Sequence, residues 1–436
     1  MSTNSVVERT LGSLRDNRAF RLFWFSNLFF FGGVWTQTLV LGWLAYQTTH
    51  SDFLVAVFTA VRLAPLLLGP FAGAFADRHN RVRLLIIAAS WALVAVSAVA
   101  TLASLGRATY WVLVLGGFAI GLAQSPSQPA RASLVLDLVG RQNLSNANAL
   151  NSMALNMTQV IGPAIGGLMI TGLGAPAALW VSTFWYAISL VTLLPLRRYG
   201  QVVGGHTESA VRMVTSGLRE IARNRLAATV LLITLAANTL LWPVAQGFIP
   251  VFAQESLGLD AAGLGWLLTC AGVGGLAGSL VIAWLGDFRF KGGMFLVGTA
   301  VWGALWGMFG LSHSVIASFV LMTAIGVMSA AFGVLQTTLL LMTTPESLHG
   351  RALGVQELAI GIMPAASLVL GAFAERYGVD ITTFVSAVLL VVTVAALGIW
   401  TPRLLRYGGD HSGDHSGDQG GDQGGGHSTG RTTVTP

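Results

Sequence analysis

Twelve long apolar runs divide this chain, and they restrict its fold more than any other feature of the sequence. A helix that spans a bilayer needs roughly 20 apolar residues, because each residue adds about 1.5 Å and the hydrocarbon layer is about 30 Å thick. Barrel strands would be about ten residues long with alternating polarity. We therefore predict an all-α membrane protein with twelve transmembrane helices, at 20–46, 53–76, 82–104, 110–130, 144–171, 176–195, 226–253, 262–285, 294–311, 315–342, 351–374 and 381–400.

Composition supports this class. The chain is 54% apolar and only 10% charged, whereas a soluble domain is about a quarter charged. A soluble fold of this length has too little interior to bury so much apolar surface.

The basic residues are distributed unevenly between the two sides of the membrane. All but three of the 24 Lys and Arg residues fall on the side that holds both termini; Arg107 and Arg376 lie opposite, and Arg62 lies inside a span. Loops rich in Lys and Arg stay in the cytoplasm. We therefore expect a multi-pass protein of the bacterial cytoplasmic (inner) membrane with both termini cytoplasmic. The net charge of +6 then reflects topology and contact with anionic lipids, and no compact basic domain points to nucleic acid.

Weak repeats divide the spans into two sets of six. Asp77 follows the second span and Asp287 the eighth, while Pro163 in the fifth span corresponds to Pro364 in the eleventh. Similar spacings predict two pseudo-symmetric six-helix bundles with a binding site between them. We place the bundles at 1–195 and 226–405, a cytoplasmic amphipathic linker at 196–225 and a disordered Gly/Asp/His-rich tail at 406–436.

In the linker, Val211, Val214, Leu218 and Ile221 share one helical face, which predicts a helix lying on the inner membrane surface. Three histidines in the tail lack the fixed geometry that a metal site needs, so we predict no metal site there. The single cysteine, Cys270, forms no intrachain disulfide or thiolate cluster and reads as a small core residue.

The most informative motif is GAFADRHNRVR at 73–83, after the second span. Gly73 allows close approach of another helix, and Asp77 is suited to cap the positive N-terminus of a neighbouring helix. Arg78 and Arg81 are suited to pair across a cytoplasmic seam that opens and closes. An ordinary basic stop-transfer loop is the alternative interpretation.

This loop resembles the signature Gly-x-x-x-Asp-Arg-x-x-Arg of the major facilitator superfamily. The wider chain, about 15–405, resembles the transmembrane secretion effector branch, which includes bacterial exporters related to the enterobactin exporter. The segments that carry this likeness are RAFRLFWFSNL, LLGPFAGAFADR, PARASLV, NANALNS, IGPAIGG and SGLREIARNRL.

The resemblance implies roles for particular residues. Asp77 would cap the start of the eleventh span near 350–351, and Arg81 would serve the same inner gate. The second copy keeps Asp287 and Lys291 but has Phe at the place of Arg78. Proton-coupled drug antiporters usually carry an Arg inside span four, and 110–130 has none before Arg131, so that motif does not imply proton coupling here.

IGPAIGG in the fifth span resembles the Gly-Pro motif of antiporters. Pro163 removes a backbone donor and favours a bend, while Gly162, Gly166 and Gly167 permit tight packing. These residues predict either a hinge at the lobe interface or plain helix packing.

Two charges lie deep in apolar spans, where burial is costly. Arg62 lies near the midplane, and three interpretations are open: it binds an anionic substrate group, it balances the charge of an acid during the transport cycle, or it is a fixed residue whose N–H groups are satisfied by carbonyls or water. Glu357, in the eleventh span, is a candidate proton carrier or a static polar contact in the inner vestibule.

Polar and aromatic residues in the spans mark a candidate cavity. Asn238, Trp242 and Gln246 lie on one stripe of the seventh span. Asn27, Gln37 and Gln159 are further candidates to line it. A mostly apolar pocket with scattered amides suits bulky amphipathic solutes.

We therefore predict a secondary active transporter that exports small amphipathic molecules, such as siderophores or drug-like compounds, by alternating access, with proton antiport as the driving force. The chain lacks a Gly-x4-Gly-Lys-Ser/Thr loop, so ATP is not expected as the driver. An importer or uniporter on the same fold is the alternative, and an intramembrane enzyme is a remote one. We expect no enzyme activity and no cofactor. The expected partners are the substrate, protons and membrane lipids, and the expected state is a monomer.

Overall fold

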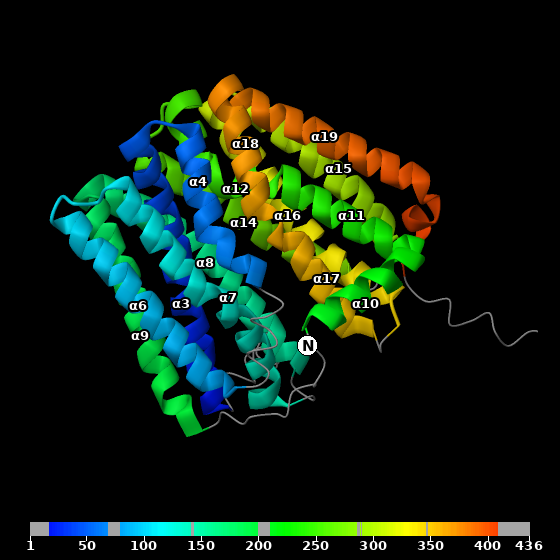
Figure 1. The fold of residues 1–436 in the computed structure, drawn as a ribbon, viewed down its shortest axis with the longest axis horizontal. Coiled ribbons are helices and arrows are strands. Elements are labelled where there is room, and N and C mark those ends of the chain that lie inside the picture. The colour runs from blue at the N-terminus through cyan, green and yellow to red at the C-terminus, as the bar shows by residue number, and fades with distance from the viewer. Residues whose placement is uncertain are drawn as a thin grey trace, which may run out of the picture.

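A computed structural model describes residues 17–68, 79–140, 144–198, 210–285, 288, 290–345 and 348–408. In this part of the chain every regular element is a helix (Figure 1). The N-terminal lobe contains α3 (Arg18–Thr49), α4 (Asp52–Leu63) with the 3-10 turn η1 (Ala64–Leu68), α6 (Arg81–Ser104), α7 (Tyr110–Val139), α8 (Leu144–Leu173), α9 (Ala175–Leu193) and η2 (Leu194–Arg198).

Helix α10 (Ala210–Arg223) precedes the C-terminal lobe. That lobe contains α11 (Arg225–Leu240), α12 (Trp242–Gly247), α13 (Ile249–Val251), the π-helical turn η3 (Phe252–Ser256), α14 (Ala261–Leu285), α15 (Lys291–Gly310), α16 (Val315–Thr343), α17 (His349–Gly361), α18 (Met363–Tyr377), α19 (Val379–Trp400) and η5 (Pro402–Arg406).

Ten of the described spans are long and apolar enough to cross a membrane. The other two predicted spans correspond to α4 and α7. Helix α4 has 12 residues, and its apolar run continues into 69–78, outside the described residues. Helix α7 has 30 residues, but the polar stretch 124–128 dilutes its apolar content. The predicted all-α class with twelve membrane helices is confirmed.

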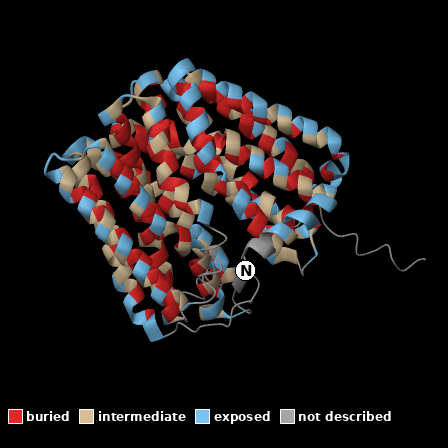
Figure 2. Cartoon of the chain, in the orientation of Figure 1, coloured by how far each residue is buried: buried red, intermediate tan, exposed pale blue. Residues whose placement is uncertain are grey.

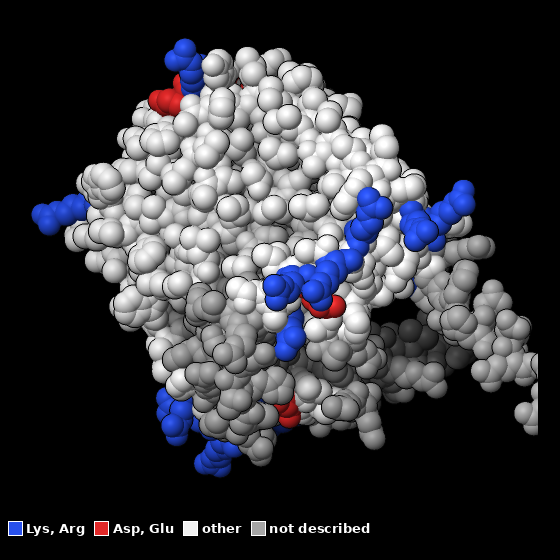
Figure 3. All heavy atoms as spheres, turned by 45° about the vertical axis from the view of Figure 1, so that its right-hand side comes forward, with Lys and Arg blue, Asp and Glu red and all other residues white. Residues whose placement is uncertain are grey.

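Exposed residues are spread along the outer helices of both lobes (Figure 2), and many of them are large and apolar. Trp111, Trp284, Ile316 and Ile399 are between 68% and 84% exposed. Figure 3 shows a wide surface without charge, with Lys and Arg gathered in small groups toward its margins. Such a surface is stable only against lipid, because an apolar area this large is not left in water.

Matching hydrogen bonds show the internal repeat directly. Asn17 caps α3 and donates its amide to the carbonyl of Leu138 at 2.7 Å. Asn224 caps α11 and donates to the carbonyl of Thr343 at 2.6 Å. In each lobe, the cap of the first helix is therefore tied to the end of the fourth.

The turn between the fifth and sixth spans of each lobe is also repeated. Gly174 has φ 87° and ψ 163°, and Gly378 has φ 86° and ψ 153°. Residues with a Cβ rarely adopt this conformation. We call the end of the molecule with these two turns the opposite end, and the end with α10 the linker end.

Two helix pairs make the most extensive contacts between the described parts of the two lobes. Helix α4 packs against α18, and α8 packs against α14. Both pairs are visible at the centre of Figure 1, where α4 lies beside α18.

The structure corrects the predicted end of the fourth span. The predicted span ends at residue 130 and leaves Arg131 in the following loop, but Arg131 lies inside α7 and is 2% exposed. Apolar residues after it, including the buried Leu134 and Val135, extend the helix to Val139 although Pro126 and Pro129 lie within it.

The seventh span is not one straight helix. It is interrupted at Leu241 and again at Phe248, just before Pro243 and Pro250. Proline lacks the backbone N–H that would continue the helix ladder. The helical path nevertheless continues through Leu241, whose N–H donates to the carbonyl of Ala237 and whose carbonyl accepts from Ala245.

Candidate functional site

A cavity of about 420 Å³ lies between the lobes. From the N-terminal lobe it is lined by Trp35 of α3 and by Asn156, Gln159 and Pro163 of α8. The C-terminal lobe contributes residues of α12, α13, α14, α15 and α16. A cavity bounded by both lobes changes shape whenever the lobes move relative to each other.

The C-terminal wall of the cavity is aromatic. Trp242 lies 5.7 Å from Trp302 between ring centroids, and Trp302 stacks on Phe332 at 5.3 Å. Trp306 lines the same wall. Polar groups on the described lining come from amides and serines, and no Asp, Glu, Lys or Arg is among them. Such a surface binds planar apolar groups and fixes them with a few hydrogen bonds.

Arg62 lies behind this wall, 5% exposed. Its Nη1 donates to Thr38 Oγ1 at 2.8 Å, and its Nη2 donates to Gln246 Oε1 at 3.3 Å. Its Nε has no partner. Because Gln246 belongs to α12 and lines the cavity, this bond links the lobes at the binding site.

Arg131 is a second buried cation in the N-terminal lobe. Its Nη1 donates to Asn27, which in turn donates to Asn151. Its guanidinium lies 4.3 Å from the ring centroid of Phe30. A cation–π contact offsets part of the cost of burying this charge.

Hydrogen bonds join the lobes at the opposite end. Tyr46 donates to Glu255, and Gln47 donates to Gln254 at 2.8 Å. Glu375 accepts from the hydroxyl of Ser51 at 2.9 Å and from the backbone N–H of Phe53 at 3.0 Å. These bonds hold the two lobes together at this end.

Carboxyl groups gather around these contacts. Asp52 comes just before the apolar run that starts at Phe53, so it lies outside the membrane-spanning segment. Partial burial, together with the negative charges of Glu255, Glu375 and Asp380, raises the pKa of Asp52 to about 7. Among the described residues, none of these carboxylates forms an ion pair.

Glycines allow α8 and α14 to cross closely. A Cβ on Gly272 would lie 2.7 Å from the backbone oxygen of Gln159, and one on Gly265 would lie 2.7 Å from that of Pro163. A Cβ on Gly167 would lie 2.5 Å from the backbone oxygen of Ala261. All three contacts cross the lobe boundary.

The motif residues of the fifth span therefore have two environments. Gly162 and Gly166 pack against α3 in their own lobe, next to Trp35 and Thr36. Gly167 and Pro163 meet the other lobe instead. Helix α8 continues through Pro163 as a single helix.

Only some predicted lining residues reach the cavity. Gln159, Trp242 and Gln246 line it. Asn27 and Gln37 are fully buried inside the N-terminal lobe, and both amide atoms of Gln37 lack a partner.

Asn238 is also away from the cavity, inside its own lobe, and donates to the carbonyl of Thr234 at 2.8 Å. Of the three residues of the predicted stripe, Trp242 and Gln246 therefore line the cavity and Asn238 does not.

Glu357 lies in α17, four residues before Gly361. Its side chain is exposed, and it is not among the described cavity-lining residues. The neighbouring Gln356 is buried and donates to Thr337 at 2.9 Å. Glu357 therefore lies between the cavity and the linker end.

Most of the predicted gating loop lies outside the described residues: Gly73, Asp77, Arg78 and Asp287. Arg81 is described, and its Nη1 lies 2.5 Å from a carboxylate oxygen of Asp137 in the same lobe. Lys291 begins α15 and approaches the sulfur of Met342 at 4.0 Å.

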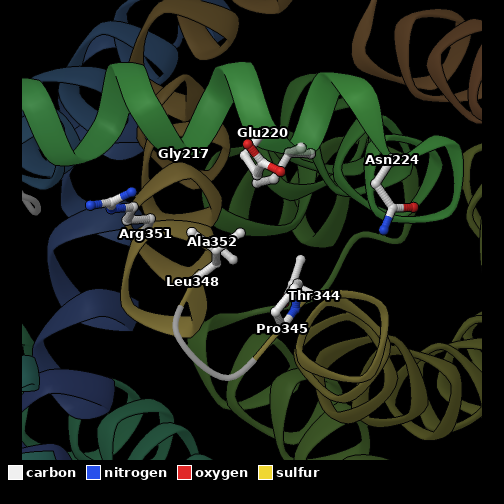
Figure 4. Close-up of a pocket in the computed structure, with 9 residues that line it drawn as sticks. Gly217, Glu220, Asn224, Thr344, Pro345, Leu348, Arg351 and Ala352 are labelled. Atoms are coloured by element: carbon white, nitrogen blue, oxygen red, sulfur yellow. The ribbon is translucent and has the colours of Figure 1, made fainter.

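The linker helix packs on the C-terminal lobe. Helix α10 lies along α17, and Figure 4 shows the small hollow between them, with Glu220 above Ala352. A Cβ on Gly217 would lie 2.9 Å from the backbone oxygen of Arg351. Ile221 is buried while Leu218 is 52% exposed. The apolar stripe of this helix is therefore divided between protein contact and exposure.

Sequence reasoning missed Trp35, Trp302 and Trp306 of the cavity and the whole set of contacts at the opposite end. Trp302 and Trp306 are spaced i, i+4 in the ninth span, which was a usable signal of one aromatic face. The contacts at the opposite end join residues 207 and 324 positions apart, and no local pattern indicates such pairs.

Comparison with known proteins gives consistent matches. The sequence model of a family described as transmembrane secretion effector matches residues 9–405. The multidrug efflux pump Tap of Mycolicibacterium fortuitum is 26% identical over 83% of this chain and 90% of that protein. The enterobactin exporter EntS of Shigella flexneri is 26% identical over 70% of this chain and 73% of that protein.

Among solved structures, a POT family transporter in complex with a thioalcohol-conjugated peptide matches with a TM-score of 0.74. The match covers 89% of this chain and 96% of that one, at 14% identity. At this identity the likeness shows the fold alone.

Proposed function

The chain belongs to the transmembrane secretion effector family of the major facilitator superfamily, and from this membership we propose that it exports small amphipathic molecules, of the siderophore or drug-like kind, by alternating access. The observation that carries the proposal is the cavity between the lobes. At the opposite end the lobes are joined by the hydrogen bonds Tyr46–Glu255 and Gln47–Gln254 and by the contacts of Glu375. Relatives named as an efflux pump and an exporter support the outward direction.

We place the linker end in the cytoplasm of a bacterial cell. Basic residues concentrate in the loops and tails of this side, and such loops stay inside. The opposite end is then periplasmic, and the structure corresponds to a state that is closed toward the periplasm. In the alternate state, the loop of Gly73, Asp77, Arg78 and Arg81, with the second copy at Asp287 and Lys291, closes the cytoplasmic end.

Proton antiport supplies the driving force in this proposal. Two sets of carboxyl groups support it: Glu357, between the cavity and the cytoplasm, and the cluster around Asp52 at the periplasmic end. An exporter of this kind takes up a proton outside after releasing its substrate, and it releases the proton inside.

Collapse of the pH gradient should stop uphill transport. We expect everted membrane vesicles to accumulate a fluorescent drug-like substrate only while the gradient is present. Glu357→Gln should abolish accumulation but retain substrate exchange, because a neutral amide cannot carry the proton. The measurement is dye accumulation with and without a protonophore.

Glu220→Gln is the matched control, because Glu220 is an exposed carboxylate at the same end of the molecule. Undiminished accumulation after the gradient has collapsed would refute proton coupling. Counterflow in oriented proteoliposomes separates export from import or uniport on the same fold.

A further inference from the structure

Among the described residues of the N-terminal lobe, two buried cations lack an acidic partner. Arg62 and Arg131 are 5% and 2% exposed. The ion pairs found among the described residues are Arg81–Asp137 and Arg223–Glu220, so neither buried guanidinium has a carboxylate within reach there. A charge in an apolar interior is costly unless it is paired, and such a site is commonly functional.

The two arginines differ in their surroundings. Arg131 is enclosed by Phe30, Phe31, Ser26 and Asn27, none of which lines the cavity, although its Nε and Nη2 also lack a hydrogen-bond partner. Arg62 instead points at Gln246, a residue of the cavity wall.

The contacts of Arg62 leave capacity for another ligand. Its bond to Thr38 is 2.8 Å, but its bond to Gln246 is 3.3 Å, at the long end for an N–H···O bond. Its Nε makes no hydrogen bond. A carboxylate or phenolate oxygen is a stronger acceptor for a guanidinium than an amide oxygen, so it would displace Gln246.

The cavity favours the same kind of ligand. Its described lining offers tryptophan rings, amides and serines but no carboxylate, so an organic cation would find cation–π contacts without an ion pair, whereas an anion would find Arg62 next to Gln246. A planar aromatic body can stack on Trp242, which is partly exposed beside the buried Trp302.

We propose that the cavity selects organic anions, with Arg62 binding the negative group of an aromatic or amphipathic substrate in place of Gln246. This assignment rests on the proposed function, because it names the charge of the exported molecule. It also gives binding a structural consequence: replacing Gln246 removes a hydrogen bond that links α4 to α12 across the lobe boundary.

The test uses three probes that share a pyrene ring and differ in charge: pyrenebutyrate, its neutral amide and the corresponding trimethylammonium compound. Binding to the purified full-length protein in nanodiscs is followed by energy transfer from tryptophan to pyrene. We expect the butyrate to bind about ten-fold or more tightly than the amide, because a hydrogen bond to a charged group is stronger than a neutral one. The cation should bind most weakly.

Substitutions test which residues cause the preference for the anionic probe. Arg62→Gln should reduce butyrate affinity to that of the amide and leave amide affinity within about two-fold. Retained amide binding also reports a folded cavity. Gln246→Ala should preserve or increase butyrate affinity, because it removes the competing acceptor. Arg107→Gln is the control, since Arg107 is an exposed arginine at the opposite end.

Equal binding of the three probes to the unmodified protein would overturn the inference, as would unchanged butyrate preference in Arg62→Gln. A loss of butyrate preference in Gln246→Ala would also contradict it. None of these results affects the vesicle assay for export, so failure of the anion assignment is distinct from failure of the proposed function.

Discussion

Replacing Gly272 with leucine is expected to abolish export. A Cβ at this position would lie 2.7 Å from the backbone oxygen of Gln159, 2.9 Å from its carbonyl carbon and 3.0 Å from the backbone nitrogen of Val160. Backbone atoms in a helix cannot rotate aside as a side chain can, so α8 and α14 must separate. Overpacking of this kind costs about 1–3 kcal/mol.

Each 1.4 kcal/mol changes a population about ten-fold, so a cost of about 1–3 kcal/mol should reduce the population of the state closed at the opposite end by about five-fold to a hundred-fold. Leucine is a better helix former than glycine, so α14 itself should not be weakened. The expected phenotype is therefore a folded protein that cannot complete its transport cycle.

The measurement combines transport with a distance across the lobes. Because Cys270 is the single cysteine of the chain, a Cys270→Ser background with Thr48→Cys and His313→Cys accepts two spin labels, one per lobe, at exposed positions of the opposite end. Gly272→Leu should lengthen the distance between the labels and remove dye accumulation in vesicles.

A matched pair separates close packing from loss of glycine. Gly275 lies in the same helix, and the nearest atoms to a Cβ there are at 3.8 and 3.9 Å. Gly275→Ala should transport like the unmodified protein, whereas Gly272→Ala should be impaired. Equal activity of the two alanine variants would contradict the proposed role of the crossing.

Raising the pH should open the opposite end of the molecule. The pKa of Asp52 is about 7 in the closed arrangement, against an ordinary value of 3.8. Closure therefore binds a proton, and by linkage the closed state is favoured at low pH. The stabilisation of the closed state by the protonated Asp52 is fully present below about pH 4 and is lost as the pH rises through about 7.

The charged groups around Asp52 explain why the closed state is less stable at high pH. Glu255 and Glu375 are acceptors of bonds across the lobes, and Asp380 accepts from Ser256 at 2.8 Å. Arg376 follows Glu375, but its guanidinium lies 5.7 Å from the ring of Tyr377 and forms no ion pair with a described carboxylate. Repulsion among carboxylates therefore increases as the pH rises.

The same pair of spin labels measures the effect. The fraction with a long distance should rise between about pH 4 and 7 and then level off. Asp52→Asn should remove most of this dependence, while Asp260→Asn, which changes a carboxylate at the same end, should retain it. A distribution that stays constant over this range in the unmodified protein would refute the linkage.

The depth of the hydrocarbon layer explains why the fold class could be predicted from the sequence. It imposes a minimum length on every span, so apolar runs such as 82–104 and 381–400 correspond to α6 and α19. Family membership was also readable, because the segments that carry the resemblance lie within the 9–405 match.

Local patterns were insufficient where a helix continues or breaks for tertiary reasons. Arg131 looked like a stop signal, yet its bond to Asn27 and its contact with Phe30 hold it inside the lobe. Pro163 leaves α8 continuous, whereas the chain is interrupted just before Pro243. Whether a proline ends a helix depends on what satisfies the freed carbonyl, and sequence spacing does not show that.

The sequence by itself determined the twelve helices, the two repeated lobes and the charge difference between the ends, because length, hydropathy and charge are properties of the chain alone. Only the tertiary structure decided which polar side chains reach the cavity: Gln159 and Gln246 do, and Asn27 and Gln37 do not. The physical reason is that helical periodicity tells which residues share a face, but the packing of neighbouring helices determines what that face meets.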